Sequence, residues 1–211
     1  MFDTFLEELN QGFSVELPGQ NAQFKMVPQG RERTNLENIE HRNPKRAAVL
    51  VLFYPVNSTP HIVLMKRNSY PGVHSDQISF PGGKFEVGDE NLKQTALREA
   101  NEELGIISAN VEIVGELTQV YIPPSNFLVN PYVGYAKEKP SFIPELKEVT
   151  EIVEADFSSI RNLSNVENVA VNVRGFKMDV PAFMINGHVV WGATAMMLSE
   201  LAHVLGPTDR V

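Results

Sequence analysis

Three glutamates near the middle of the chain carry its clearest chemical signal. Glu99, Glu102 and Glu103 are spaced i, i+3 and i+4, so on a helix they share an arc of about 100°. Like charges at this spacing destabilise a helix, and acids in a last turn oppose its dipole. The cluster is therefore either a solvated acidic surface or a site that binds a cation. Arg98 and Lys93 are expected on other faces of the helix.

The turn before these glutamates favours the cation. Phe80-Pro81-Gly82-Gly83-Lys84 predicts a tight bend from which a backbone carbonyl points outward. Carboxylate and carbonyl oxygens select Mg²⁺ or Mn²⁺ over zinc, and no histidine lies between residues 80 and 106. The chain has no cysteine, which excludes a thiolate nucleophile and cysteine-based metal sites.

Length and charge limit the classes of function. The 211 residues, 43% hydrophobic and 21% charged, predict a single domain over residues 1–211, with residues 1–20 as an N-terminal helical extension. A net charge of −8 argues against nucleic acid as a partner. A small phosphorylated substrate is compatible with this charge if a divalent cation stands between carboxylate and phosphate.

The sequence also predicts a cytoplasmic protein without a membrane partner. Met1–Leu9 holds acids but no Lys or Arg, unlike a secretory signal. The longest apolar run, Ala47–Tyr54, is much shorter than the ~20 residues that span a membrane.

A helix and a sheet must position the glutamates. A helix is predicted over Glu90–Leu104, with Asp89 as N-cap and Gly105 as its end. The apolar run Ala47–Tyr54 predicts a strand buried on both faces, and His61–Met65 its hairpin partner. The turn between them is expected to contain Pro55, Asn57, Ser58 and Pro60. Further predicted helices are Phe2–Phe13 and Ala193–Leu205, and further strands are Val111–Ile122, Phe127–Ala136, Val149–Val153, Val169–Met178 and Val189–Trp191. The pattern indicates α/β class, with a mixed sheet between helices.

The glutamate segment resembles the signature of a known family. Gly83, Glu90 and the run Arg98-Glu99-Ala100-Asn101-Glu102-Glu103-Leu104-Gly105-Ile106 resemble the Nudix box, a loop–helix–loop placed here over 80–106. Six residues separate Gly83 from Glu90, one more than usual, and five separate it from Asp89. This is similar to the longer loop of the coenzyme A pyrophosphatase branch, which has an Asp at the position of Asp89. The resemblance implies an α/β/α sandwich around a mixed sheet.

A second stretch resembles the signature of the same branch, which begins Leu-Leu-Thr-x-Arg and ends Phe-Pro-Gly-Gly. The chain has Val63-Leu64-Met65-Lys66-Arg67 and Phe80-Pro81-Gly82-Gly83 at the same separation. Gly72 stands where the signature has Arg, and Asp76 where it has Gly. Trp191–Ala195 is similar to the C-terminal region of that branch.

The resemblance implies a metal site in the box. The Gly82 carbonyl, Glu99 and Glu103 would bind Mg²⁺ or Mn²⁺, with Glu102 as a further ligand or water-positioning group. Arg98 would orient the glutamates by ion pairing. Glu102, Glu103 and Arg98 therefore belong to the predicted catalytic set.

The resemblance also implies hydrolysis of a diphosphate, with a general base from outside the box. Glu148 is the first candidate for this base, with Glu145 and Glu151 behind it. The expected reaction converts coenzyme A or acyl-coenzyme A to 3′,5′-ADP and (acyl-)4′-phosphopantetheine. The departures at Gly72 and Asp76 leave another nucleotide, such as ADP-ribose or NADH, open as substrate.

Three residues are expected to bind the nucleotide substrate. Arg67 would contact phosphate or nucleotide by its place in the signature, and His74 would line the pocket. Arg46 would belong to a basic rim before the first core strand. For each, an ordinary structural or solvated role remains the alternative.

Two further questions stay open at this stage. A Nudix-fold module that senses a nucleotide without cleaving it is a different class of function, although such a module is expected to lack some of the box glutamates. Relatives also dimerise, so the helix with Phe2, Phe5 and Leu9 either forms a homodimer contact or caps the domain.

Overall fold

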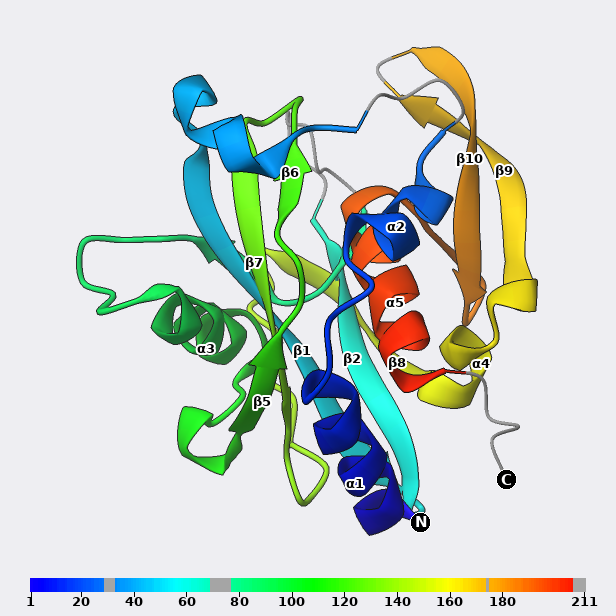
Figure 1. Cartoon of the computed structure of the whole chain (residues 1–211). Helices are drawn as coiled ribbons and strands as arrows, with labels where there is room; N and C mark the ends of the chain where they lie inside the picture. Colours follow the sequence, from blue (N-terminus) through cyan, green and yellow to red (C-terminus); the bar gives the residue numbers. More distant parts are fainter. Residues whose placement is uncertain (29–32, 69–76, 174, 207–211) are drawn as a thin grey trace.

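An eight-stranded mixed sheet forms the centre of the molecule (Figure 1). This computed structural model describes residues 1–28, 33–68, 77–173 and 175–206. The strands of the sheet are β1 (Lys45–Val56), β2 (Thr59–Arg67), β3 (Ile78–Ser79), β4 (Gly82–Lys84), β5 (Glu112–Glu116), β6 (Val120–Ile122), β7 (Phe127–Tyr135) and β8 (Val149–Asp156). The main order is β3-β2-β1-β7-β5, while β4 pairs with β1, β6 with β7 and β8 with β2. β1 is parallel to β7 and antiparallel to β2 and β4, which makes the sheet mixed.

Helices cover both faces of this sheet. α3 (Leu92–Leu104) lies on one face, and α1 (Phe2–Phe13) and α5 (Gly192–Leu205) lie on the other (Figure 1). The shorter helices α2 (Gln20–Gln23) and α4 (Phe157–Arg161) both contact α5. Single 3₁₀ turns or short 3₁₀ helices are η1 (Phe24–Met26), η2 (Leu36–Arg42), η3 (Ser108–Asn110) and η4 (Leu163–Asn165). The predicted α/β/α sandwich around a mixed sheet is confirmed.

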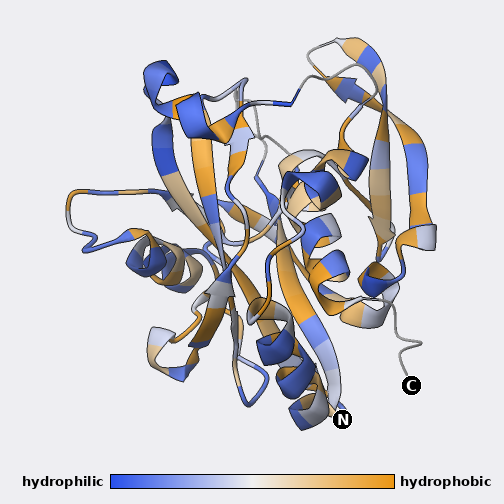
Figure 2. Ribbon diagram, in the orientation of Figure 1, coloured by the Kyte–Doolittle hydropathy of each residue, from blue (hydrophilic) through white to orange (hydrophobic). Residues whose placement is uncertain are grey.

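β1 is apolar throughout its centre because each of its faces packs against a separate core. Val51 and Phe53 belong to the core under α1 and α5, whereas Leu50 and Leu52 belong to the core under α3. Successive side chains of a strand point to opposite faces, so burial on both sides requires a continuous apolar run. Figure 2 shows this run as hydrophobic colour along the central strands.

A smaller antiparallel sheet lies beside α5 and α4. It consists of β9 (Val166–Val173), β10 (Phe176–Ile185) and β11 (His188–Val190), with β10 in the middle. The prediction of one strand over Val169–Met178 was wrong, because the chain reverses within that range. Gly175 has φ 85° there, a left-handed conformation that suits a turn better than a strand.

The β1–β2 hairpin is tighter than the sequence predicted. Pro55 and Pro60 are paired with each other within the strands, so they do not belong to the turn. Asn57 and Ser58 alone form it, with φ of 50° and 65°. Two-residue hairpin loops favour positive φ at both positions, because that twist matches the twist of the strands.

α3 begins two residues later than predicted. Its N-cap is Asn91, whose side chain accepts a hydrogen bond from the backbone N–H of Gln94 at 3.0 Å. The prediction of Asp89 as N-cap was wrong, since that carboxylate is engaged elsewhere. Gly105 ends the helix in the left-handed conformation, as expected, with φ 69°.

The apolar face of α1 is used within the chain. Phe2, Phe5 and Leu9 are buried, and the Phe5 ring centroid lies 4.8 Å from that of Phe53 and 6.0 Å from that of Phe157. These rings cap the core beneath α5. A homodimer therefore stays a prediction, and this face does not supply its contact.

None of the helices within the described ranges is long and apolar enough to cross a membrane.

Gly82 of β4 pairs with β1 at a position that has no room for a side chain. Its φ is 154°, and a Cβ there would lie 2.3 Å from the backbone oxygen of Ala48. We expect Gly82→Ala to lower the free energy of unfolding by about 3 kcal/mol, because backbone strain adds to a clash with backbone atoms. Urea unfolding at neutral pH measures this change. Gly88→Ala is the control, since nothing lies within 4 Å of its Cβ, and equal loss in both variants would contradict the argument.

Candidate active site

The Gly82–Gly83 segment of β4 supports two of the glutamates. The Glu103 Oε2 accepts a hydrogen bond from the Gly82 N–H at 2.7 Å, and the Glu103 side chain is only 2% exposed. The Glu99 carboxylate lies directly over Gly83, where a Cβ would be 2.4 Å from the Glu99 Cδ. The Gly82–Gly83 segment therefore forms a cradle for both carboxylates: the Gly82 N–H binds Glu103, and the absence of a side chain at Gly83 leaves room for Glu99.

Asp89 and Arg98 form a rigid pair behind this cradle. Arg98 donates from Nε to Asp89 Oδ1 at 2.8 Å and from Nη2 to Oδ2 at 3.0 Å. Asp89 also accepts from the Thr95 hydroxyl at 2.8 Å and from the Glu86 N–H at 3.0 Å. The Arg98 guanidinium, followed by these neutral donors, holds the pKa of Asp89 well below its usual range. Asp89 thus anchors Arg98 to the loop that precedes α3.

The anchored arginine contacts two of the box glutamates. Its Nη1 lies 2.9 Å from Glu99 Oε1 and 2.9 Å from Glu102 Oε2. The expectation that Arg98 lies on another face of the helix was wrong. Its long side chain extends toward Asp89, and its guanidinium contacts these glutamates as well. Glu102 is 58% exposed at the rim of the cluster. Arg98 therefore reduces the repulsion that makes this sequence unfavourable for an isolated helix.

A second arginine approaches the cluster from the end of β2. Arg67 Nη1 donates to Glu103 Oε1 at 3.0 Å, and its Nη2 lies 3.8 Å from Glu148 Oε2. Glu148 precedes β8, which pairs with β2 and brings Val149 opposite Arg67. Of the three predicted base candidates, the structure brings Glu148 to the cluster. The Glu145 side chain accepts from the Lys147 N–H, and Glu151 pairs with His188 at 3.1 Å.

The buried carboxylates of this cluster are electrostatically costly. Burial raises the pKa of Glu103 to about 7, although Arg67 and the Gly82 N–H oppose the shift. Burial also raises the pKa of Glu99. The charge of Glu148 acts in the same direction on both groups. A positive charge added among these three carboxylates would therefore be strongly stabilised.

The donor set fits a hard divalent cation in chemical type. Glu99, Glu103 and Glu148 offer only oxygen ligands, and the Gly82–Gly83 cradle places the first two beside backbone. As the side chains stand, no group of three acidic or histidine residues in the described part of the chain is arranged to hold an ion. The predicted ligands of Mg²⁺ or Mn²⁺, namely Gly82, Glu99, Glu102 and Glu103, stay a prediction.

The other predicted substrate residues either pair with a carboxylate outside the glutamate cluster or lie outside the described residues. Arg46 lies at the start of β1, where its guanidinium pairs with Glu40 of η2. His74 lies outside the described residues, as do the signature positions Gly72 and Asp76. Sequence reasoning missed the Asp89–Arg98 pair. The sequence contained a signal for this pair, since Asp89 stands at the acidic position of the longer loop that resembles the coenzyme A pyrophosphatase branch. Its interpretation as a helix N-cap hid the pairing with Arg98.

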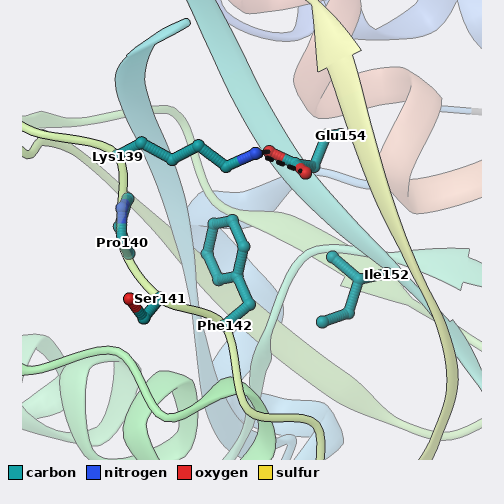
Figure 3. Close-up of a pocket in the computed structure, with 6 residues that line it drawn as sticks. All are labelled: Lys139, Pro140, Ser141, Phe142, Ile152 and Glu154. Atoms are coloured by element: carbon teal, nitrogen blue, oxygen red, sulfur yellow. Dashed lines mark hydrogen bonds and ion pairs between the residues drawn. The ribbon is translucent and has the colours of Figure 1, made fainter.

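A cavity of about 490 Å³ opens on the same face of the sheet as α3. Lys139, Pro140, Ser141, Phe142, Ile152 and Glu154 line it (Figure 3). Phe142 and Ile152 form its apolar part, and a Lys139–Glu154 ion pair at 2.7 Å closes one side (Figure 3). Among the residues that the structure describes, none of the predicted site residues lines this cavity.

Comparison with known proteins agrees with this geometry. The profile of the NUDIX domain matches residues 44–176, which include the cradle, α3 and both arginines. The chain belongs to the Nudix family. The prediction of an enzyme of the Nudix diphosphatase class is confirmed.

Two curated relatives and one solved structure place this Nudix hydrolase among its neighbours. It is 32% identical over 162 residues to the uncharacterized Nudix hydrolase NudL of Photorhabdus laumondii, covering 76% of this chain and 84% of that one. It is 33% identical over 168 residues to the mitochondrial coenzyme A diphosphatase NUDT8 of Homo sapiens, covering 78% and 71%. The crystal structure of the Nudix hydrolase RenU from M. smegmatis matches with a TM-score of 0.51 at 14% identity, over 85% of this chain and 92% of that chain. That last likeness shows the fold alone.

The Asp89–Arg98 pair predicts a specific dependence of stability on pH. Folding lowers the pKa of Asp89. Its contribution to the free energy of unfolding is therefore complete above the unfolded pKa of ~4, and it is lost progressively as the pH falls below that value. We expect Asp89→Asn to lower the free energy of unfolding by about 2 kcal/mol at pH 7. The difference from wild type should shrink as the pH falls below about 4.

Urea unfolding of both proteins between pH 7 and pH 3 measures this difference. Asp179→Asn, at an exposed position of β10, is the matched control and should stay within about 0.5 kcal/mol of wild type. A difference that does not change with pH would show that the charge of Asp89 is not what stabilises the fold.

Proposed function

We propose that the protein hydrolyses the diphosphate of coenzyme A or an acyl-coenzyme A, using Mg²⁺ or Mn²⁺. The observation that carries the proposal is the Gly82–Gly83 cradle with Glu99 and Glu103 packed on it, within a region similar to a coenzyme A diphosphatase. The branch signature that ends at this cradle and contains Arg67 supports the same substrate.

The proposal gives each residue of the cluster a role, which its contacts support. Glu99 and Glu103 bind the cation, together with the Gly82 carbonyl, and Glu102 at the exposed rim adds a ligand or positions water. Arg98, fixed by Asp89, keeps Glu99 and Glu102 oriented. A bound divalent cation neutralises diphosphate charge and lowers the pKa of water.

Glu148 is the base of this proposal. It is 54% exposed, so it has access to solvent, and it lies beside the buried carboxylates without being packed among them. It accepts a proton from the water whose oxygen attacks one phosphorus. The bond from that phosphorus to the bridging oxygen breaks, and the other phosphate leaves with the bridging oxygen. The products are 3′,5′-ADP and 4′-phosphopantetheine, or its acyl form.

The proposal is tested by incubating the protein with coenzyme A, ADP-ribose and NADH in parallel, with Mg²⁺ or Mn²⁺. Mass spectrometry of the products should show 3′,5′-ADP and 4′-phosphopantetheine as the fastest pair to form. Glu99→Gln and Glu103→Gln should each lower turnover at least 100-fold while circular dichroism shows a folded protein, because each loses a cation ligand and relieves repulsion. Faster cleavage of ADP-ribose or NADH would replace coenzyme A as the substrate. Nucleotide binding without products in either metal would indicate a sensor.

The cavity beside β8 is suited to the part of the substrate that does not react. Ile152 pairs with Met65, two residues along β2 from Arg67. This separation corresponds to about 7 Å of strand. Phe142 and Ile152 give the cavity apolar walls, and Ser141 and Lys139 add polar groups (Figure 3). A long arm of mixed polarity that extends from the diphosphate along β8 would reach it.

Filling this cavity should therefore affect substrate binding more than chemistry. We expect Ile152→Trp to raise the KM for coenzyme A at least fivefold while kcat changes less than twofold, because the arm loses its place and the glutamates keep theirs. Steady-state kinetics at saturating Mg²⁺ measures both constants. Ile143→Trp, at an exposed position of the same segment, is the control. An unchanged KM in Ile152→Trp would place the arm elsewhere.

The assembly and location of the protein remain predictions. A cytoplasmic site and a homodimer were expected from the sequence, and the human relative is named as mitochondrial.

A further inference from the structure

The two arginines of the site differ in how they are held. Arg98 makes two hydrogen bonds to Asp89, a residue outside the glutamate cluster, and also donates to the Lys84 carbonyl at 3.2 Å. It would keep its position if Glu99 and Glu102 turned away. Arg67 is different, because the side-chain contacts that the described residues offer it are with Glu103 and Glu148.

The partners of Arg67 are carboxylates to which the proposed function assigns other tasks. Glu103 is a proposed cation ligand, and Glu148 is the proposed base. A carboxylate oxygen that coordinates a divalent cation cannot keep a short hydrogen bond from a guanidinium in the same direction. The cation would also repel the positive charge of Arg67 at this distance. One Glu103 oxygen already accepts from the Gly82 N–H and the other from Arg67. Cation binding to Glu103 therefore competes with the Arg67–Glu103 ion pair, whereas Arg98 keeps its two hydrogen bonds to Asp89 in either state.

Arg67 has a route out of the pair. Its side chain is 21% exposed, whereas that of Glu103 is 2% exposed. It is the last residue of β2, where its backbone is held by Val149 and Gln77, so its side chain can change rotamer while the backbone stays in place. A guanidinium is also well suited to bind a diphosphate through two parallel hydrogen bonds.

We propose that Arg67 is an exchangeable counter-ion: it holds Glu103 and Glu148 until a divalent cation displaces it, and it then turns to the substrate diphosphate. The inference rests on the proposed metal site and gives Arg67 two successive partners, the carboxylates before the cation binds and the diphosphate afterwards. It explains how a nearly buried carboxylate is kept paired before the cation arrives. It also couples the arrival of the cation to the release of a phosphate-binding group.

The first test measures Mn²⁺ affinity without substrate, by isothermal titration calorimetry or by the electron paramagnetic resonance of free Mn²⁺. We expect Arg67→Gln to bind Mn²⁺ at least threefold more tightly than wild type, because the cation no longer has to displace a guanidinium. Arg67→Lys keeps a positive charge and should stay within twofold of wild type. Lys84→Gln removes a charge from an exposed position near the cradle, and it should also stay within twofold because exposed charges are screened.

The second test uses the wild-type protein and does not depend on the folding of a variant. Phenylglyoxal modifies accessible guanidinium groups, and peptide mass spectrometry locates each modified arginine. Saturating Mn²⁺ should raise the rate of modification at Arg67 at least threefold, and added coenzyme A should lower it again. Arg98 is the internal control, since Asp89 holds it with or without the cation.

Several results would overturn the inference. If a folded Arg67→Gln bound Mn²⁺ no more tightly than wild type, Arg67 would be a fixed partner of the carboxylates. A rate of Arg67 modification that does not respond to Mn²⁺ would show the same. Equal tightening in Lys84→Gln would reduce the effect to general charge. A wild-type protein that binds no Mn²⁺ would overturn both this inference and the proposed metal site. Exchange seen with Mn²⁺ but no cleavage of coenzyme A would support the role of Arg67 and reject only the proposed substrate.

Discussion

The constraint on which the site depends is the burial of carboxylates that also repel one another. Glu103 is almost fully buried, Glu99 packs over Gly83, and Glu148 adds its charge to both. An uncompensated cluster of this kind would lower the stability of the fold. Arg67 and Arg98 supply the compensation within the chain. The same repulsion gives the cluster its proposed affinity for a divalent cation, so the feature that costs stability is also the one that serves the chemistry.

The fold holds this cluster by tying one helix to a short strand. α3 presents its small and apolar residues, among them Ala96, Ala100 and Leu104, to β1, and β4 pairs with β1 at its edge. Gly83 can then lie directly under the Glu99 carboxylate, because it has no side chain at the contact, and the Gly82 N–H reaches Glu103. The second core, under α1 and α5, supports the opposite face of the same strand. The glutamates of the site are therefore held in position because β1 is packed on both of its faces.

One arginine supplies the cluster with a fixed positive charge, and the other supplies a releasable one. Asp89 lies in the loop before α3 and accepts four hydrogen bonds, two of them from Arg98. Arg67 comes from the other side, on β2, and depends on the cluster itself. A rigid arginine preserves the geometry of the glutamates, and a releasable one leaves a charge available for a phosphate.

The sequence by itself determined the elements and the chemistry of the box, because both are local. The spacing of Glu99, Glu102 and Glu103 sets a helical face, Gly105 sets a helix end, and a continuous apolar run sets a strand buried on both faces. Only the tertiary structure decided which charges meet. Arg67 and Glu148 are far from the box in sequence and come to Glu103 through the pairing of β2 with β8. Asp89 was predicted as a helix cap, since cap propensity is visible in sequence whereas a bidentate partner nine residues away is not. Long side chains have several rotamers within reach of several partners, and packing of the whole chain selects among them.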